Sequence, residues 1–280
     1  MGKINFFAGP AILAPEVLKG SQDAIENFKG MDLSLLEISH RSKQFVEVLD
    51  EAQAKVKSLL DIPDEYAVLF LTGGASSQFY MTAMNLLDSD ASAGYLDTGT
   101  WSTRAIKEAK LYGDIEIVAS SKDKNFSYIP KGYNINPDFR YLHVTTNNTI
   151  YGTQMHALPN TDVRIVADMS SDIFSRRIDI KRYDLIYAGA QKNLGPAGTT
   201  LVIVKKDTLN KVNRAIPTML NYQTHVDKNS SYNTPPVYAV YVSLLSLRWL
   251  HDNGGIANMQ QHNEQKAALL YDEIDRNGLF

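Results

Sequence analysis

The chain has 280 residues, of which 44% are hydrophobic and 21% charged, and its 28 basic and 31 acidic side chains give a formal charge of −3. A chain of this length buries about 75% of the surface that its unfolded form exposes, so we expect a folded protein with a substantial core. No dense block of lysine and arginine offers a stripe of phosphate contacts, which argues against a nucleic-acid partner.

The chain contains no cysteine. Disulfides, thiolate metal sites and cysteine nucleophiles are therefore excluded within these residues, and we predict no metal site. Pro10 and Pro15 interrupt the N-terminal segment, which shows no targeting signal. The longest membrane-like run, Ala239–Leu250, is shorter than the roughly 20 residues of a spanning helix and contains Arg248. We expect a soluble, cytoplasmic protein with no membrane partner.

From residue 45 to residue 260, short apolar runs alternate with amphipathic helical patterns. This alternation predicts an α/β fold with a mostly parallel sheet flanked by helices and right-handed crossovers. The strands expected in chain order are Ala67–Leu71, Ala93–Leu96, Ile115–Val118, Arg140–Val144, Val163–Ala167, Leu185–Ala188 and Thr200–Val204. The helices expected between several of them include Phe45–Leu60, Ser77–Leu87 and Ser102–Tyr112.

A long helical pattern from Ile256 to Ile274 follows Gly254-Gly255, and the chain ends soon after it. No internal repeat, low-complexity tract or flexible linker divides the sequence before that helix. We therefore expect one large domain over residues 1–257, including the N-terminal segment, and a connecting helix over residues 258–280.

Ligands of such sheets bind at the carboxyl ends of the strands, so polar residues that follow the apolar runs are candidates for a site. Gly73-Gly74 in FLTGGASSQF separates a strand from a helix that begins near Ser76, where free N–H groups and the helix dipole favour a phosphate. The segment matches neither a Walker loop nor the dinucleotide fingerprint, and a glycine pair after a strand is also a common turn.

Two more strand ends carry side chains that suit a flat cofactor. Trp101 follows Thr98-Gly99-Thr100, where its indole could stack on a ring or fill the core. Thr149 follows the strand Arg140–Val144 and could hydrogen-bond a cofactor oxygen or only its own turn. The residues by themselves leave both alternatives open.

Asp168 ends the run VRIVAD, so its carboxylate should emerge at the carboxyl end of a buried strand. A carboxylate there could pair with the pyridinium nitrogen of pyridoxal phosphate and keep that ring protonated. A helix N-cap is the alternative use of an aspartate at this position.

Lys192 lies in AGAQKNLGPAG, a Gly/Pro-rich turn between the apolar runs DLIYA and TTLVIV. Because both flanking strands should be buried, its ammonium is expected to face the core or a ligand crevice. Desolvation would lower the pKa of the amine and favour the neutral form that attacks carbonyl groups. A turn lysine that extends to solvent is the more common case for an isolated turn, but the preceding Asp168 favours the cofactor.

These motifs resemble those of the phosphoserine aminotransferases, which belong to the class V pyridoxal-phosphate aminotransferases. The resemblance runs from residue 4 to the last residue, and YAGAQKNLGPAG, EISHR and NTPP are its most specific strings. The matching strings in chain order are FAGPAILAPEVL, EISHRSKQF, GGASSQF, GTWS, NNTIYGTQ, VADMSS, YAGAQKNLGPAGTTLVIV and YNTPPVYA. The resemblance implies the aspartate-aminotransferase fold, fold type I, with the family's C-terminal small domain missing after Phe280.

The activity implied by the resemblance is transfer of an amino group between glutamate and 3-phosphohydroxypyruvate, with pyridoxal 5'-phosphate as cofactor. The products would be O-phosphoserine and 2-oxoglutarate, in serine biosynthesis, with a role in pyridoxine biosynthesis left open. The family also implies a homodimer with shared active sites.

By the same resemblance, Lys192 would hold the cofactor covalently and Asp168 would pair with its ring nitrogen, which makes these two the predicted catalytic residues. The remaining predicted cofactor contacts are Ala75, Ser76, Trp101, Thr149 and Gln191, with Asn233 and Thr234 from the other subunit. His40 and Arg41 are implied near the substrate, where the arginine fork suits an anionic group. A surface pair at a strand end is their alternative reading.

One segment departs from the family pattern. Many bacterial members carry Gly-Gly-Gly-Arg-Gly-Gln where this chain has Gly73-Gly74-Ala75-Ser76-Ser77-Gln78, so a cationic side chain is lost at the phosphate site. Two alternative functions stay open at this point. One is another class V aminotransferase or a cysteine desulfurase, which His40-Arg41 and NTPP disfavour, and the other is a dimeric cofactor-binding fragment without turnover.

Overall fold

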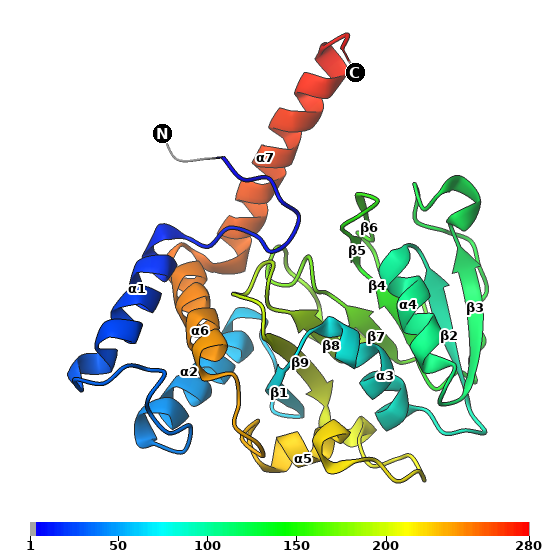
Figure 1. Cartoon of the computed structure of the whole chain (residues 1–280). Helices are drawn as coiled ribbons and strands as arrows, with labels where there is room; N and C mark the ends of the chain where they lie inside the picture. The colour runs from blue at the N-terminus through cyan, green and yellow to red at the C-terminus, as the bar shows by residue number, and fades with distance from the viewer. Residues whose placement is uncertain (1–3, 280) are drawn as a thin grey trace.

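A seven-stranded sheet with the spatial order β1-β9-β8-β7-β4-β2-β3 forms the centre of the fold (Figure 1). The computed structural model describes residues 4–279. The strands of the sheet are β1 (Tyr66–Thr72), β2 (Ser92–Asp97), β3 (Asp114–Ser120), β4 (Leu142–Thr145), β7 (Ile165–Asp168), β8 (Tyr183–Gly189) and β9 (Thr199–Lys205). A separate hairpin consists of β5 (Asn147–Asn148) and β6 (Thr153–Gln154).

The sheet is parallel except at β9, which pairs antiparallel with both β1 and β8. The turn 190–198 between β8 and β9 contains no helix, whereas a parallel crossover needs roughly a dozen or more residues. The chain must therefore turn back on itself after β8. This reversal keeps the turn that contains Lys192 at the same sheet edge as the carboxyl ends of β4 and β7.

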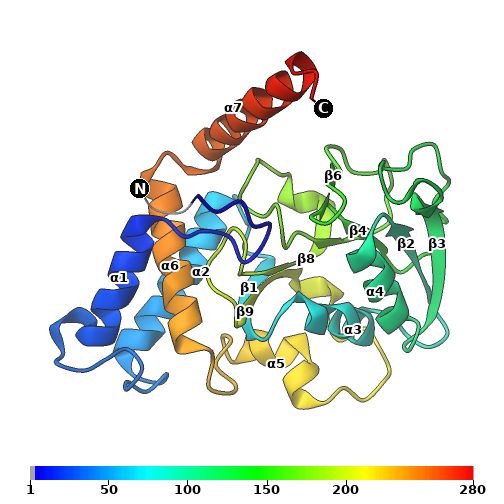
Figure 2. The ribbon, with the colours of Figure 1, turned by 45° about the horizontal axis from the view of Figure 1, so that its top comes forward.

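Helices cover both faces of the sheet (Figures 1 and 2). The helices α1 (Pro15–Glu26), α2 (Lys43–Leu59) and α6 (Val237–Asp252) contribute to the core on one face. On the other face, the core includes α3 (Ala75–Leu86), α4 (Thr100–Ala109) and α5 (Tyr222–Asp227). Strand β1 supplies alternate residues to the two cores, Val68 and Phe70 to the first and Leu69 and Leu71 to the second.

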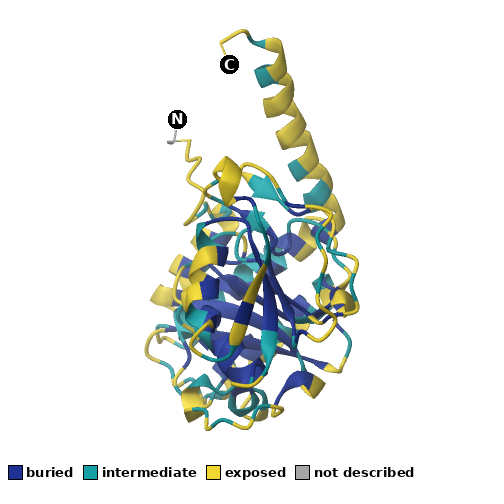
Figure 3. Cartoon of the chain, turned by 90° about the vertical axis from the view of Figure 1, so that its right-hand side faces the viewer, coloured by how far each residue is buried: buried dark blue, intermediate teal, exposed yellow. Residues whose placement is uncertain are grey.

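The last helix, α7 (Gly255–Arg276), projects from the sheet and its helices and is largely exposed (Figure 3). The boundary expected between residues 257 and 258 falls in its first turn. Within residues 4–279, no helix combines the length and the apolar character needed to cross a membrane. In the described part of the chain, five short 3-10 helices lie in the connections: η1 (Phe28–Gly30), η2 (Lys122–Lys124), η3 (Ile180–Arg182), η4 (Lys206–Thr208) and η5 (Thr218–Leu220).

The seven strands and the four helices α2, α3, α4 and α7 expected from the sequence are confirmed, with ends displaced by a few residues. Sequence patterns missed α1, α5 and the β5–β6 hairpin. The hairpin strands have two residues each, too few for an alternating pattern to show.

Substitution of Phe45 tests the packing of α2 against the sheet. Phe45 is 0% exposed and the adjacent Val46 is 42% exposed, so the two positions form a matched pair. We expect Phe45→Ala to lower the free energy of unfolding by about 3–5 kcal/mol and Val46→Ala to change it by less than about 0.5 kcal/mol. Urea unfolding of the cofactor-free protein measures both, and equal losses would contradict the observed burial of this helix.

Candidate active site

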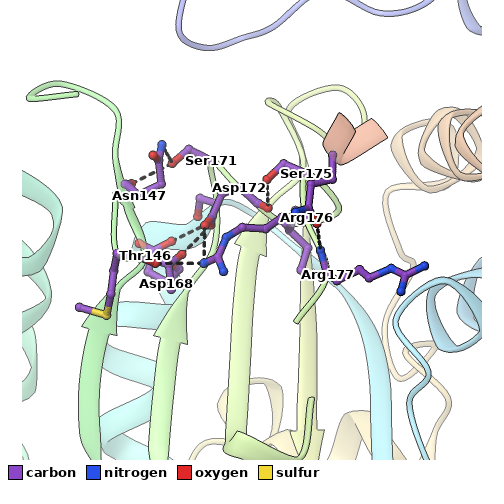
Figure 4. Close-up of polar contacts among 12 residues, drawn as sticks. Thr146, Asn147, Asp168, Ser171, Asp172, Ser175, Arg176 and Arg177 are labelled. Carbon is purple, nitrogen blue, oxygen red and sulfur yellow. Dashed lines mark hydrogen bonds and ion pairs between the residues drawn. The ribbon is translucent and has the colours of Figure 1, made fainter. Parts of the chain in front are cut away.

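The carboxyl ends of β4, β7 and β8 meet at one edge of the sheet, and the turns after them form the candidate site (Figures 1 and 4). Thr145 at the end of β4 lies opposite Asp168 at the end of β7, and Asp168 lies opposite Tyr187 of β8. Since the turn after β8 carries Lys192, the sheet register brings the predicted carboxylate and the predicted amine to the same edge.

Lys192 makes a direct contact with Thr149 across the site. Its Nζ donates a hydrogen bond to Thr149 Oγ1 over 2.5 Å. Burial lowers the pKa of the Lys192 amine, while the nearby carboxylates of Asp168 and Asp172 act in the opposite direction. The lysine is thus partly buried and hydrogen-bonded within the chain, while its role at a ligand site remains a prediction.

The N-terminal segment closes one side of the Lys192 turn. The amide of Ala11 donates to the carbonyl of Gln191 over 2.8 Å. A Cβ atom at Gly9 would lie 3.0 Å from both Cγ and Cε of Lys192. Glycine at this position therefore allows the backbone to pass close along the stem of the lysine.

Asp168 is a buried carboxylate at the end of β7, only 5% exposed. The amide of Ser170 donates to its Oδ1 over 2.9 Å. Burial raises the pKa of this carboxyl, and the hydrogen bonds from Ser170 and the charge of Lys192 oppose that rise. The N-cap alternative is wrong, because a turn follows β7 and the next helical element begins only at Ile180.

The predicted phosphate site lies at the start of α3. Gly74 is the N-cap and Ala75 and Ser76 form the first turn, whose amides have no acceptor within the helix. Gly73 has φ of 107°, a conformation that side-chain-bearing residues rarely adopt, so the turn requires glycine there. The geometry is suited to an anion, and the roles of Ala75 and Ser76 remain predictions.

Trp101 occupies the first turn of α4, with the guanidinium of Arg104 5.0 Å from its ring centroid. Its indole Nε1 is buried, and so is Thr145 Oγ1, yet neither atom has a hydrogen-bond partner within residues 4–279. Buried polar atoms are usually paired, so the two atoms have unused hydrogen-bonding capacity, and Thr145 lies opposite Asp168 in the sheet.

Four predicted residues lie outside the turns that follow β4, β7 and β8. His40 and Arg41 precede α2, with Arg41 exposed, and Asn233 and Thr234 precede α6, with the Asn233 amide donating to the Thr234 carbonyl. Across the described part of the chain, no hydrogen bond or ion pair joins these four to Lys192. Gln191 lies directly beside the lysine, and its Oε1 would meet a Cβ atom at Gly189.

Sequence reasoning missed a polar network below the site, which involves Thr146, Asp172 and Arg176 (Figure 4). Asp172 and Arg176 form an ion pair with Nη2 and Oδ2 separated by 3.3 Å. The sequence feature that could have indicated this network is an acidic and a basic residue four positions apart, soon after a buried strand, in VADMSSDIFSRR.

Known proteins are similar to this chain in both sequence and fold. The family described as Aminotransferase class-V matches residues 4–280. A phosphoserine aminotransferase of Parabacteroides distasonis is 61% identical over 280 residues, which are 100% of this chain and 78% of that protein. The solved phosphoserine aminotransferase from Bacillus circulans subsp. alkalophilus has a TM-score of 0.93 at 45% identity, covering 97% of this chain and 76% of that one. A pyridoxal-phosphate-bound phosphoserine aminotransferase from Trichomonas vaginalis has a TM-score of 0.92 at 34% identity, covering 98% and 77%.

The mixed sheet, with a lysine turn after β8 and a carboxylate at the end of β7, is the framework of a fold-type-I transferase, as the resemblance implied. The chain belongs to the class-V aminotransferases and, within them, to the phosphoserine aminotransferase family.

Competitive acetylation of the cofactor-free protein tests the environment of Lys192. The exposed Lys19 is a control with the opposite shift, because its ion pair with Asp23 raises its pKa. We expect the labelling rate of Lys192 to reach half its maximum at a lower pH than that of Lys19, as burial disfavours the charged amine. A midpoint equal to or above that of Lys19, measured by mass spectrometry of the two peptides, would contradict a desolvated Lys192.

Proposed function

We propose that this chain transfers the amino group of glutamate to 3-phosphohydroxypyruvate, with pyridoxal 5'-phosphate as cofactor, giving O-phosphoserine and 2-oxoglutarate for serine biosynthesis. The observation that carries the proposal is the half-buried Lys192 amine, held by Thr149 beside buried carboxylates. The 61% identity to a phosphoserine aminotransferase over the whole chain supports this choice of substrates.

The described residues fit the chemical groups of pyridoxal phosphate. The primary amine of Lys192 suits the aldehyde, and the buried carboxylate of Asp168 suits a protonated ring nitrogen. Trp101 offers an aromatic face and an unpaired Nε1. The first turn of α3, with Ala75 and Ser76, offers backbone donors to a phosphate.

When bound, pyridoxal phosphate supplies a carbonyl carbon that amines attack and a protonated ring that accepts electrons. Burial favours the neutral form of Lys192, which is the form able to attack a carbonyl or to accept a proton at Nζ. Thr149 holds this nitrogen in one place. From there Nζ can accept the proton of the substrate Cα and later donate it again. The carboxylate of Asp168 would stabilise positive charge on the ring nitrogen of the bound cofactor.

Two further residues are proposed to bind the substrate. His40 and Arg41 lie together in the segment before α2, and the guanidinium of the exposed Arg41, which has no described partner within residues 4–279, is suited to paired hydrogen bonds with a carboxylate or a phosphate. Neither residue has a described hydrogen bond or ion pair with Lys192. They are therefore proposed to contact the substrate and not the lysine.

We also propose a homodimer in the cytoplasm, in which Asn233 and Thr234 reach the cofactor phosphate of the other subunit. Support comes from the lack of a described hydrogen bond between these two residues and Lys192, and from Pro235 and Pro236, which stiffen the loop after them. Residues 1–257 are proposed as the cofactor domain and 258–280 as a connecting helix. Ile256 of α7 is buried next to that boundary, whereas Leu269 and Leu270 are exposed.

Borohydride reduction tests the covalent attachment. We expect pyridoxal phosphate to be fixed to the peptide that contains Lys192, because this amine combines partial burial with a lowered pKa. Peptide mapping by mass spectrometry locates the label, and Lys192→Ala is the control that should lose it. Label found mainly on another lysine would refute the assignment.

A single-turnover assay with glutamate separates the alternative functions. We expect stoichiometric 2-oxoglutarate from the cofactor-loaded protein and a rate about 10²–10⁴-fold lower for Lys192→Ala, which lacks the proton-transferring amine. Cysteine in place of glutamate should release no sulfide. Sulfide release would favour a desulfurase, and the absence of 2-oxoglutarate from a loaded protein would favour a non-catalytic scaffold.

A further inference from the structure

The hairpin β5–β6 carries the residue that touches the Lys192 amine. Asn147 pairs with Gln154 and Asn148 with Thr153, and Thr149 lies in the turn between the two strands. In Figures 1 and 2 the hairpin stands above the sheet edge, beside the ends of β4 and β7. The position of Thr149 against Lys192 therefore depends on what holds the two ends of this hairpin.

The first end of the hairpin is Thr146, which is fully buried. Its amide donates to the carbonyl of Asp168 over 3.1 Å, and its hydroxyl donates to Asp172 Oδ1 over 2.5 Å. Next to it, Asn147 and Ser171 exchange two hydrogen bonds of 2.8 Å. Figure 4 shows that these contacts join the start of the hairpin to the turn after β7.

The second end of the hairpin is Met155, whose amide donates to the carbonyl of Thr146 over 2.7 Å. Its own carbonyl accepts from Arg176 Nη2 over 3.2 Å. The same nitrogen lies 3.3 Å from Asp172 Oδ2. The ion pair of Asp172 and Arg176 therefore contacts both ends of the hairpin, one through each partner.

Because Asp172 is buried, this ion pair is sensitive to the loss of either charged partner. Asp172 is 5% exposed, and burial raises the pKa of its carboxyl, while the Thr146 hydroxyl and the Arg176 charge act against that rise. Removal of one partner from such a pair leaves the other charge buried without compensation. The cost of an unpaired buried charge therefore favours conformations in which Thr146 and Arg176 both stay in contact with Asp172.

We infer that Asp172 and Arg176 are positioning residues, an ion-pair clamp that fixes the hairpin 146–155 so that Thr149 holds the Lys192 amine. The charge of Asp172 acts on the Lys192 amine directly, but neither member of the clamp has a described hydrogen bond to Lys192 or Thr149, so their positioning effect runs through the hairpin backbone. The inference rests on the proposed function only for the catalytic role of Lys192. The positioning itself can be measured without turnover.

Hydrogen exchange of the full chain, with and without pyridoxal phosphate, tests whether the clamp holds the hairpin. Arg176→Met keeps an apolar stem but removes both hydrogen bonds, and we expect the Met155 and Gly152 amides to exchange roughly 10- to 100-fold faster. Arg176→Lys keeps a charged donor and should restore most of the protection. Arg177→Ala is the matched control, because Figure 4 shows the Arg177 side chain pointing away from Asp172.

A double-mutant cycle tests whether the clamp acts through Thr149. Arg176→Met should shift the pH midpoint of Lys192 acetylation, because a displaced hairpin withdraws the Thr149 hydroxyl from Lys192 Nζ. In a Thr149→Val background the same substitution should shift the midpoint much less, since the contact is already absent. A purely electrostatic effect of the unpaired Asp172 would persist unchanged in that background.

Local loss of protection in residues 146–155, with protection in β9 unchanged and a non-additive cycle, supports the clamp. Unchanged exchange in the hairpin, or equal midpoint shifts with and without the Thr149 hydroxyl, overturns it. If Arg176→Met does not fold, Thr146→Val is the second variant, because it removes the hydrogen bond to Asp172 at the other end of the hairpin. Hydrogen exchange and the acetylation midpoint of Lys192 are then measured in the same way. Both readouts exist in the cofactor-free chain, so a failure of the proposed transaminase activity would not change them.

Discussion

The partial burial of one amine beside two carboxylates is the constraint on which the site depends. Burial alone would lower the pKa of Lys192, and the charges of Asp168 and Asp172 oppose that shift. The same burial raises the pKa of both carboxyls, which Lys192, Ser170, Thr146 and Arg176 counteract. Burial therefore shifts the pKa of all three groups towards their neutral forms, and the charges and hydrogen bonds between neighbours oppose that shift.

The sheet supplies the geometry for this balance. A turn of nine residues, 190–198, is too short for a parallel crossover, so β9 runs antiparallel to β8 and Lys192 stays at the edge where β7 presents Asp168. On the face below Asp168, His143 Nε2 lies 2.8 Å from the Tyr187 hydroxyl, which joins β4 to β8 across β7. Burial lowers the pKa of His143 to about 3, so this imidazole is neutral at physiological pH.

Two segments that are far apart in the chain complete the surroundings of the amine. The N-terminal segment passes along the lysine stem, where Gly9 leaves room for its Cγ and Cε atoms. The β5–β6 hairpin approaches from the other strand ends and places Thr149 on Nζ. In the buried network of Thr146, Asp172 and Arg176, loss of one of the observed hydrogen bonds would leave a further polar group without a partner, since Arg176 Nε already has none within residues 4–279.

The sequence by itself determined the seven strands, the order of strands and helices, and Lys192 and Asp168 as residues at strand ends. These features are local: apolar runs, glycine turns and the residue that follows each run are all contained in short windows of sequence. Only the tertiary structure decided which strand ends meet. The hydrogen bond from Lys192 to Thr149 joins residues 43 positions apart, and that from Arg176 to the Met155 carbonyl joins residues 21 positions apart. Such contacts depend on the order β4-β7-β8 and on strand register, which no short window of sequence contains.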